Sequence, residues 1–252
     1  MIVRLCGGLG NAFFQYAFGR SLQARQRKVQ FLWQDEREGY ALGPYNLNVD
    51  LVSSLYGPFS TYKDKAFVFD ASVYDASPDI FLDGYWQSEK YFESISDEIR
   101  KELTLTMVSD EVSRTADRLR EGNSVFLHVR RGDYLNPWTA QYHGNLGMDY
   151  YNKAIEYIKE RVADVQVFVF SDDPGWCKGM LPCEVISGRF NRYEDLYLLS
   201  QTRHAIIANS TYSWWGAWLG ERSDSIVVAP QRWFGTAPLD VSDVIPSRWV
   251  KL

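Results

Sequence analysis

The side chains best suited to chemistry gather directly after two apolar runs. The first run, residues 125–129, leads into Arg130, Arg131, Gly132 and Asp133. Residues two apart on a strand share a face, so His128 and Arg130 point the same way and Arg131 points to the opposite side. A guanidinium at the end of a strand can hold a phosphate through two charge-assisted hydrogen bonds. The cluster predicts either an anion site or ion pairs with nearby carboxylates.

Two carboxylates, Asp172 and Asp173, follow the second apolar run at residues 165–170. A carboxylate can accept both the N1 and the exocyclic amine protons of guanine, which would make a site selective for that base. The same segment could instead cap a helix, with Ser171 or Asp172 at the N-cap and Pro174 in the first turn. Both interpretations can hold, because one Asp can cap while its neighbour binds.

A third cluster, Asn209-Ser210-Thr211-Tyr212-Ser213, ends an apolar run and opens an apolar helix. Hydroxyls and N–H groups at a helix start suit a phosphate, although they also cap buried helices. We expect the tryptophans at 214, 215 and 218 to be core.

The turn Gly7-Gly8-Leu9-Gly10-Asn11 resembles half of a dinucleotide fingerprint. Phe13 stands where the third glycine would allow close helix packing, so the turn is a weak nicotinamide signal. It is better suited to exposing N–H groups to a ligand.

The elements that must position these clusters alternate along the chain. Apolar runs predict strands at residues 2–6, 29–33, 80–82, 124–129, 165–170, 204–208 and 225–229. Helical patterns cover residues 12–27, with Asn11 as N-cap, and 89–103, 110–120, 148–162, 193–202 and 213–219. Such alternation predicts parallel sheets, whose ligands lie at the carboxyl ends of the strands. We place a boundary between two α/β halves near Glu121-Gly122, which gives domains 1–121 and 122–252.

The amino-acid composition argues against some classes of protein. The net charge of −5 and the lack of a basic block argue against nucleic-acid binding. Nine Trp and sixteen Tyr suit sugar binding or ordinary core packing. We find neither a secretory signal nor an apolar run of membrane-spanning length. The cysteines at 6, 177 and 183 lack a C-x-x-C spacing and predict free thiols, as in a cytoplasmic protein.

The sequence also lacks the paired carboxylates that commonly bind a divalent metal in transferases. No Asp-x-Asp occurs, and that pair often holds Mg²⁺ or Mn²⁺ in sugar-nucleotide transferases. We therefore expect no metal. If the leaving group is a nucleoside diphosphate, Arg and N–H donors must stabilise its charge.

Taken together, the motifs resemble those of the α-1,2-fucosyltransferase family. Residues 128–134 are similar to its first motif, 170–173 to its second and 209–218 to its third, and residues 7–11 and 84–92 are also similar. The resemblance covers residue 7 to about residue 219. The family continues the first turn with Gln-Met-Phe-Gln, whereas Ala12-Phe13-Phe14-Gln15 follows here.

The resemblance implies a GT-B-type α/β fold, with two facing Rossmann-like domains and a cleft between them. The N-terminal domain would take the acceptor and the C-terminal domain would take GDP-fucose. The reaction implied is inverting, metal-independent transfer of L-fucose from GDP-β-L-fucose to a sugar hydroxyl, in the first instance O-2 of a β-galactoside.

The same resemblance assigns roles to individual residues. Arg130 would hold the diphosphate, and His128 and Asp173, with Asp172 beside them, would read guanine. The remaining donor contacts would come from Ser210, Thr211, Ser213, Gly8, Gly10 and Asn11. Asp133 is the candidate general base, because it follows the arginines on the same loop. Trp86 and Gln87 are candidate acceptor contacts, and further acceptor contacts are expected from residues 40–78 and 138–147.

Three alternatives stay open at this stage. An NAD-dependent oxidoreductase would use the glycine turn but leaves the later motifs unexplained. A non-catalytic carbohydrate-binding protein would use the aromatic residues but gives no reason for His-x-Arg-x-Gly-Asp. A fucosyltransferase with another linkage or acceptor, such as α-1,6 transfer or a rhamnose-containing polysaccharide, fits the same donor motifs. We expect His143 and His204 to be structural.

Overall fold

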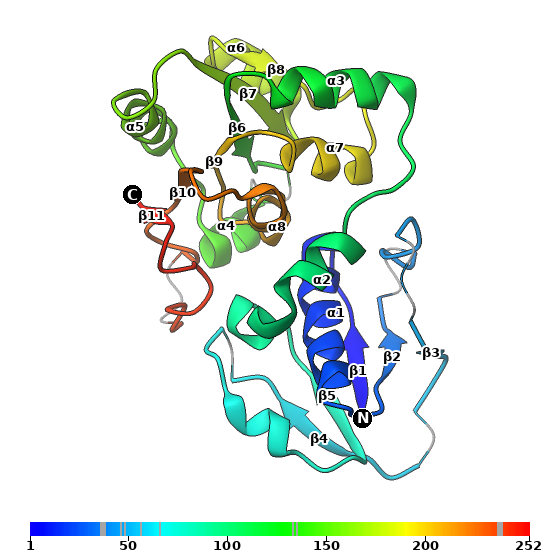
Figure 1. Cartoon of the computed structure of the whole chain (residues 1–252). Helices are drawn as coiled ribbons and strands as arrows, with labels where there is room; N and C mark the ends of the chain where they lie inside the picture. The colour runs from blue at the N-terminus through cyan, green and yellow to red at the C-terminus, as the bar shows by residue number, and fades with distance from the viewer. Residues whose placement is uncertain are drawn as a thin grey trace. The chain divides into compact units, whose positions relative to one another are not determined.

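The computed structural model describes residues 1–35, 39–45, 47, 49–55, 57–65, 67–132, 134, 136–235 and 239–252. The chain forms two compact units. Unit 1 comprises Met1–Thr106 and Leu239–Pro246, and unit 2 comprises Met107–Pro238 and Ser247–Leu252. Each unit has its own parallel sheet (Figure 1), so the predicted strand–helix alternation is confirmed.

Unit 1 contains a five-stranded sheet in the order β3-β2-β1-β5-β4. Its strands are β1 (Ile2–Leu5), β2 (Gln30–Trp33), β3 (Leu51–Val52), β4 (Ser60–Lys63) and β5 (Ile80–Asp83). Helix α1 (Leu9–Ala24) connects β1 to β2, and most of its side chains are buried. Short helical segments precede and follow β5: η1 (Ala71–Asp75) comes before it, and η2 (Glu89–Tyr91), η3 (Glu93–Ile95) and α2 (Ser96–Glu102) come after it. The helix predicted over 89–103 is thus split, and the break lies at Phe92, whose φ of −129° is not helical.

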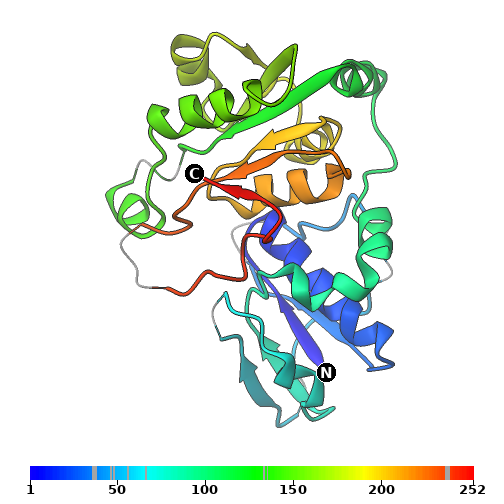
Figure 2. The same ribbon diagram turned by 60° about the vertical axis from the view of Figure 1, so that its left-hand side comes forward.

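Unit 2 contains a six-stranded sheet in the order β11-β10-β9-β6-β7-β8 (Figure 2). Its strands are β6 (Asn123–Val129), β7 (Val165–Ser171), β8 (Glu184–Val185), β9 (His204–Ile206), β10 (Val227–Ala229) and β11 (Val250–Lys251). Its helices are α3 (Asp110–Arg120), α4 (Pro137–His143), α5 (Met148–Lys159), α6 (Pro174–Met180), α7 (Arg192–Leu199) and α8 (Thr211–Gly220).

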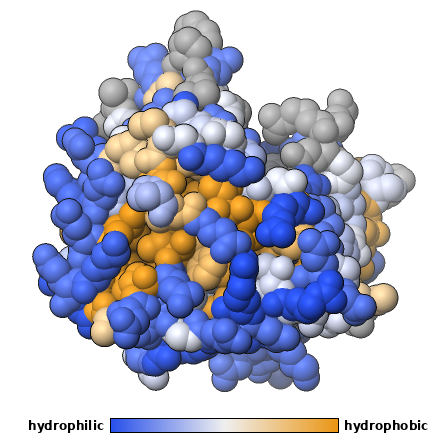
Figure 3. All heavy atoms as spheres, turned by 90° about the horizontal axis from the view of Figure 1, so that it is seen from above, coloured by the Kyte–Doolittle hydropathy of each residue, from blue (hydrophilic) through white to orange (hydrophobic). Residues whose placement is uncertain are grey.

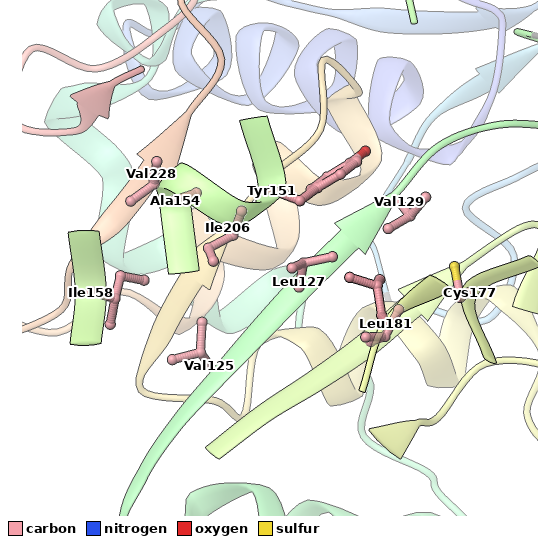
Figure 4. Close-up of a cluster of buried hydrophobic side chains, with 11 residues drawn as sticks. Val125, Leu127, Val129, Tyr151, Ala154, Ile158, Cys177, Leu181, Ile206 and Val228 are labelled. Carbon is pink, nitrogen blue, oxygen red and sulfur yellow. The ribbon is translucent and has the colours of Figure 1, made fainter. Parts of the chain in front are cut away.

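Successive side chains of β6 point to opposite faces of the second sheet and contact different helices. Val125, Leu127 and Val129 pack with buried residues of α5 and α6 in one apolar cluster (Figure 4). Phe126 contacts the opposite side, where residues of α7 and α8 line a small hollow beside it. Because residues two apart share a face, His128 lies on the same side of the sheet as Phe126.

The division into units differs from the expected boundary near residues 121–122. Helix α3 packs against α7 and therefore belongs to unit 2, so the chain passes between the units at Thr106–Met107. The segment Leu239–Pro246 returns to unit 1, where Asp243 accepts a hydrogen bond from the Phe69 N–H at 2.8 Å and pairs with Lys90. Its residues Val244 and Ile245 are buried. The chain pattern carries no signal for such a return.

Most of the large apolar side chains are buried in the interior. The tryptophans at 214, 215 and 218 are buried, as predicted. The face of the molecule in Figure 3 is largely hydrophilic and includes a band of apolar residues. Among the described large hydrophobic side chains, Tyr85 and Tyr142 are the exposed aromatic ones. None of the described helices combines the length and apolarity needed to cross a bilayer.

Candidate active site

The two arginines and the two aspartates of the sequence motifs meet at one edge of the second sheet. Strands β6 and β7 are parallel neighbours with Val129 opposite Ser171, so their carboxyl ends lie side by side. Arg130 Nη1 lies 2.8 Å from Asp172 Oδ2, and Arg131 Nε lies 3.2 Å from Asp173 Oδ2. The motif predicted to bind an anion and the motif predicted to bind guanine are therefore joined as two ion pairs.

The two arginines are held very differently. The guanidinium of Arg131 stacks on the Trp176 ring, 3.9 Å from its centroid, while its backbone N–H donates to Asp172 Oδ1 at 2.8 Å. Arg130 instead lies over the Tyr134 ring at 5.4 Å, and a third of its side chain is exposed. Arg131, with 26% of its side chain exposed, is thus held closely by Trp176 and Asp173, and Arg130, at 33%, is the more open of the two cations.

Gly132 keeps the loop close to the Asp172 carboxylate. A Cβ at this position would lie 2.7 Å from Asp172 Oδ2, the oxygen that pairs with Arg130. Any larger residue would have to displace that carboxylate. The glycine therefore preserves the geometry of the Arg130–Asp172 pair.

His128 is a neutral group inside this cluster. It is buried, and its Nδ1 has no hydrogen-bond partner among the residues that the structure describes. Burial, and then the charge of Arg130, lower the pKa of His128 to about 3, against an opposing effect of Asp172. Its ring lies 5.7 Å from that of Tyr212 in α8. A neutral imidazole with an unused nitrogen suits hydrogen bonding to a base or a sugar.

Asp173 is the N-cap of α6. Its Oδ1 accepts from the Trp176 N–H at 3.1 Å and its Oδ2 pairs with Arg131, so both oxygens are engaged. The capping interpretation is confirmed, with Asp173 as the cap in place of Ser171 or Asp172 and Pro174 as the first helical residue. This placement does not support the predicted contact of Asp173 with guanine.

A carboxylate that the sequence patterns did not indicate lies at the same edge. The Ser171 N–H donates to Ser187 Oγ at 3.0 Å, and this hydroxyl donates to Asp195 Oδ2 at 3.0 Å. Asp195 Oδ1 is buried without a partner in the described part of the chain. Burial, despite the bond from Ser187, raises the pKa of Asp195 to about 6. The sequence gives no separate signal for Asp195, because an acidic residue in the first turn of a helix capped by Asn191 is ordinary.

The third motif opens α8 as predicted, but its hydroxyls differ in role. Ser213 is fully buried and its Oγ donates to the carbonyl oxygens of Ala208 and Ser210 at 3.3 and 3.2 Å, so it is structural. Ser210 occupies the N-cap position, although its side chain makes no capping hydrogen bond within the described structure. Thr211 follows in the first turn and is partly exposed.

In unit 1 the predicted residues group around the start of α1. Gly8 is the N-cap, so the helix begins at Leu9 and Asn11 lies inside it, contrary to the predicted cap. Gly10 is buried in the first turn. Asn11 Oδ1 accepts a hydrogen bond from Gln87 Nε2 at 3.0 Å, which brings a predicted donor contact and a predicted acceptor contact together. Gln87 is itself buried.

Trp86 is fully buried, and its ring stacks on Phe18 at 4.1 Å. This does not support the predicted acceptor contact, because no part of the ring is open to a sugar. The core interpretation, which the apolar surroundings of α1 favour, accounts for the residue. Asp133, the predicted general base, lies outside the described residues.

Comparison with known proteins agrees with this arrangement. A family model described as glycosyl transferase family 11 matches residues 59–251. The chain belongs to this family. The predicted kinship with the α-1,2-fucosyltransferases is also confirmed by curated relatives. An α-1,2-colitosyltransferase from Escherichia coli is 30% identical, with 100% of this chain and 98% of the relative covered.

Two other curated relatives extend the comparison. The O-antigen biosynthesis glycosyltransferase WbnK of Escherichia coli is 30% identical over 98% of this chain and 99% of its own length. A galactoside α-(1,2)-fucosyltransferase 1 from Ateles belzebuth is 29% identical over 56% of this chain and 43% of the relative.

Solved structures show the fold of this family member. A glycosyl transferase family 9 protein from Veillonella parvula has a TM-score of 0.58 at 10% identity, with 100% of this chain and 86% of that chain covered. The ADP-heptose lipopolysaccharide heptosyltransferase II of E. coli has a TM-score of 0.51 at 12% identity, over 100% and 89%. The predicted α/β fold of GT-B type, with parallel sheets, is confirmed.

Proposed function

We propose that this family 11 glycosyltransferase moves L-fucose from GDP-β-L-fucose to O-2 of a galactoside, with inversion and without a metal. The observation that carries the proposal is Arg130, a partly exposed guanidinium held by Asp172 at the carboxyl end of β6. Such a cation suits the β-phosphate of a nucleoside diphosphate. The α-1,2 linkage is taken from the names of two relatives, the colitosyltransferase and the fucosyltransferase.

In this mechanism the acceptor hydroxyl attacks C1 of fucose from the side opposite GDP. The C1–O bond to the β-phosphate breaks as the new bond forms, which turns the β-linked sugar into an α-linked one. Arg130 neutralises the charge that develops on the departing phosphate. The hydroxyl proton passes to a general base, for which Asp133 remains our candidate. An Asp133→Asn variant that kept full turnover would remove that role.

We further propose that Asp195, and not Asp173, recognises guanine together with His128. Asp195 Oδ1 is buried and unpartnered in the described chain, while both oxygens of Asp173 are engaged. A carboxylate can accept both guanine protons, N1–H and one of the amine protons. Because the pKa of Asp195 is raised to about 6, its accepting form prevails only above that pH.

The remaining donor contacts are proposed from their positions. Ser210 and Thr211, at the start of α8, would donate to phosphate or sugar oxygens. Gly8, Gly10 and Asn11, at the start of α1, stay candidate donor contacts. We also propose a cytoplasmic location, because Cys6, Cys177 and Cys183 are all free thiols.

Colitose is a second candidate for the transferred sugar. It is the 3-deoxy analogue of L-fucose, and the colitosyltransferase relative matches the whole chain at 30% identity. Both donors would present the same GDP group to Arg130, His128 and Asp195. Competition between GDP-fucose and GDP-colitose at equal concentration would distinguish them.

The first test is calorimetric titration of EDTA-treated protein with GDP, ADP and UDP. We expect GDP to bind without metal, and Asp195→Asn to lose about tenfold or more in GDP affinity while an Asp117→Asn control on α3 does not. A folded protein that binds ADP as tightly as GDP would contradict the proposed base recognition. Absence of any nucleotide binding would refute the proposed donor.

A further inference from the structure

A stack of aromatic rings leads outward from Arg130 within unit 2. The Tyr134 ring lies under the guanidinium and is parallel to the His143 ring, with centroids 4.6 Å apart and an interplanar angle of 10°. His143 in turn contacts Tyr142 at 4.9 Å and Phe234 at 5.8 Å. Tyr134 is 6% exposed, whereas Tyr142 is 45% exposed. The row of rings thus begins beside Arg130, the candidate phosphate-binding residue, and ends at the exposed Tyr142.

Hydrogen bonds of Asn209, in the third motif, connect the segments that carry the outer rings to unit 2's sheet. Its Nδ2 donates to the carbonyl oxygens of His143 at 2.7 Å and of Trp233 at 3.2 Å, and its own carbonyl oxygen accepts from Tyr134 Oη at 3.1 Å. Asn209 is buried. One residue between β9 and α8 therefore fixes both segments that carry the rings and ties them to the loop after Arg130.

Close backbone packing holds the two segments together. The Gly235 N–H donates to the Tyr142 carbonyl oxygen at 2.8 Å. A Cβ on Gly235 would lie 2.6 Å from the Gln141 carbonyl oxygen, and one on Gly144 would lie 3.2 Å from the Gly235 Cα. The rings of Tyr142 and Phe234 consequently lie 5.2 Å apart, with their planes inclined at 56°. The backbone contacts thus fix the spacing of the two segments that carry the rings, and such preorganisation suits a ligand platform.

We propose that Tyr142, His143 and Phe234 form an aromatic platform that binds the acceptor sugar by stacking against its pyranose ring. The inference rests on the proposed sugar transfer and names the acceptor side of that same site. A β-galactoside carries H3, H4 and H5 on one face, which makes that face apolar. Aromatic rings bury such a face while the hydroxyls stay at the edge, in water or in reach of polar groups.

The position of the platform favours an acceptor over a nucleotide base. In a nucleotide sugar the transferred sugar is attached to the β-phosphate, on the far side of the diphosphate from the base. Asn209, which anchors the platform, follows β9, whereas Ser171, which is linked through Ser187 to Asp195, ends β7, and these two strands flank β6 on opposite sides. An acceptor must approach C1 of the transferred sugar, and the ring stack starts at the arginine that would hold its phosphate. His143, expected from the sequence to be structural, is then also part of a binding surface.

The test compares variants of the full chain by saturation-transfer NMR with methyl β-D-galactopyranoside, and titrates GDP in parallel. The variants are Tyr142→Ala, Phe234→Ala and Tyr142→Trp, with Tyr157→Ala on α5 as the matched aromatic control. We expect roughly fivefold loss of saturation transfer in both alanine variants of the platform. Tyr142→Trp and the control should retain the signal, and all four should bind GDP like the parent.

Each outcome bears on one of the two proposals. Unchanged saturation in Tyr142→Ala and Phe234→Ala would overturn the platform, as would a parent protein that binds GDP but gives no galactoside signal. Loss of saturation in the platform variants alone would support it. If the parent binds no GDP while the platform variants still lose the galactoside signal, the donor proposal fails and the platform stands.

Discussion

Replacing Arg130 by alanine removes one guanidinium from the carboxyl end of β6 and leaves the rest of the site in place. Its ion pair with Asp172 joins side chains that are 33% and 25% exposed, and such pairs contribute about 1 kcal/mol or less to stability. Asp172 keeps its bond from the Arg131 N–H. The variant should therefore fold, with a melting temperature close to that of the parent.

The loss in catalysis should be far larger than the loss in stability. A preorganised donor aimed at developing charge contributes about 3–4 kcal/mol, so turnover should fall roughly 100- to 1,000-fold. Arg130→Lys keeps the charge but loses the two-pronged geometry, and should recover only part of this loss. Kinetics with GDP-fucose and lactose, together with GDP titration, would measure both effects.

Arg131→Ala is the matched control, because it removes the same chemical group from the neighbouring position. Stacking on Trp176 and the bond to Asp173 should together contribute about 1–2 kcal/mol of stability. We expect its melting temperature to fall by roughly 2–8 °C and its turnover per folded molecule to change much less than in Arg130→Ala. The reasoning is refuted if Arg131→Ala abolishes turnover without losing stability while Arg130→Ala remains active.

Three more substitutions test other parts of the structure. Because burial holds the pKa of His128 near 3, the folded state stays neutral while an unfolded histidine takes up a proton below about pH 6.5, so stability is present at neutral pH and is lost on acidification. Chemical denaturation at pH 6.5 and 5 should show a loss of about 2 kcal/mol that His128→Asn lacks. Gly132→Ala should displace the Asp172 carboxylate and lower turnover about tenfold with little change in melting temperature, and a fully active variant would count against the importance of that ion pair. Trp86→Ala should lose about 3–5 kcal/mol in urea unfolding, whereas a stable variant with only a raised acceptor KM would restore Trp86 as a sugar contact.

The fold was predictable where apolar runs are long and regular. The runs ending at Val129 and at Phe170 became neighbouring strands, and parallel pairing alone explains why Arg130 meets Asp172. The pattern over 110–120 matches α3 at both ends. Between residues 35 and 78 the strands are only two and four residues long, too short for a periodic signal.

The candidate site was less predictable, because burial and hydrogen-bond partners decide it. Asp173 and Asp172 are adjacent in sequence, yet one caps a helix and the other holds Arg130. Asp195 stands in an ordinary helical pattern, and only the tertiary contact with Ser187 reveals it as a buried carboxylate. Trp86 lies next to Gln87 in a family-like motif, but the packing of Phe18 on its ring makes it core.

The return of Leu239–Pro246 to unit 1 limits how genes of this family can recombine. A hybrid gene with a single crossover at Thr106–Met107 takes residues 1–106 from one parent and all later residues from the other. Its unit 1 then combines residues 1–106 of the first parent with the segment Leu239–Pro246 of the second. The partners Phe69 and Lys90 would then face a foreign segment in place of Asp243, and the buried Val244 would have to fit a foreign core. Viable hybrids should need a second and a third crossover flanking this segment. Exchange of acceptor specificity between relatives is therefore easier by substituting single loops than by swapping halves.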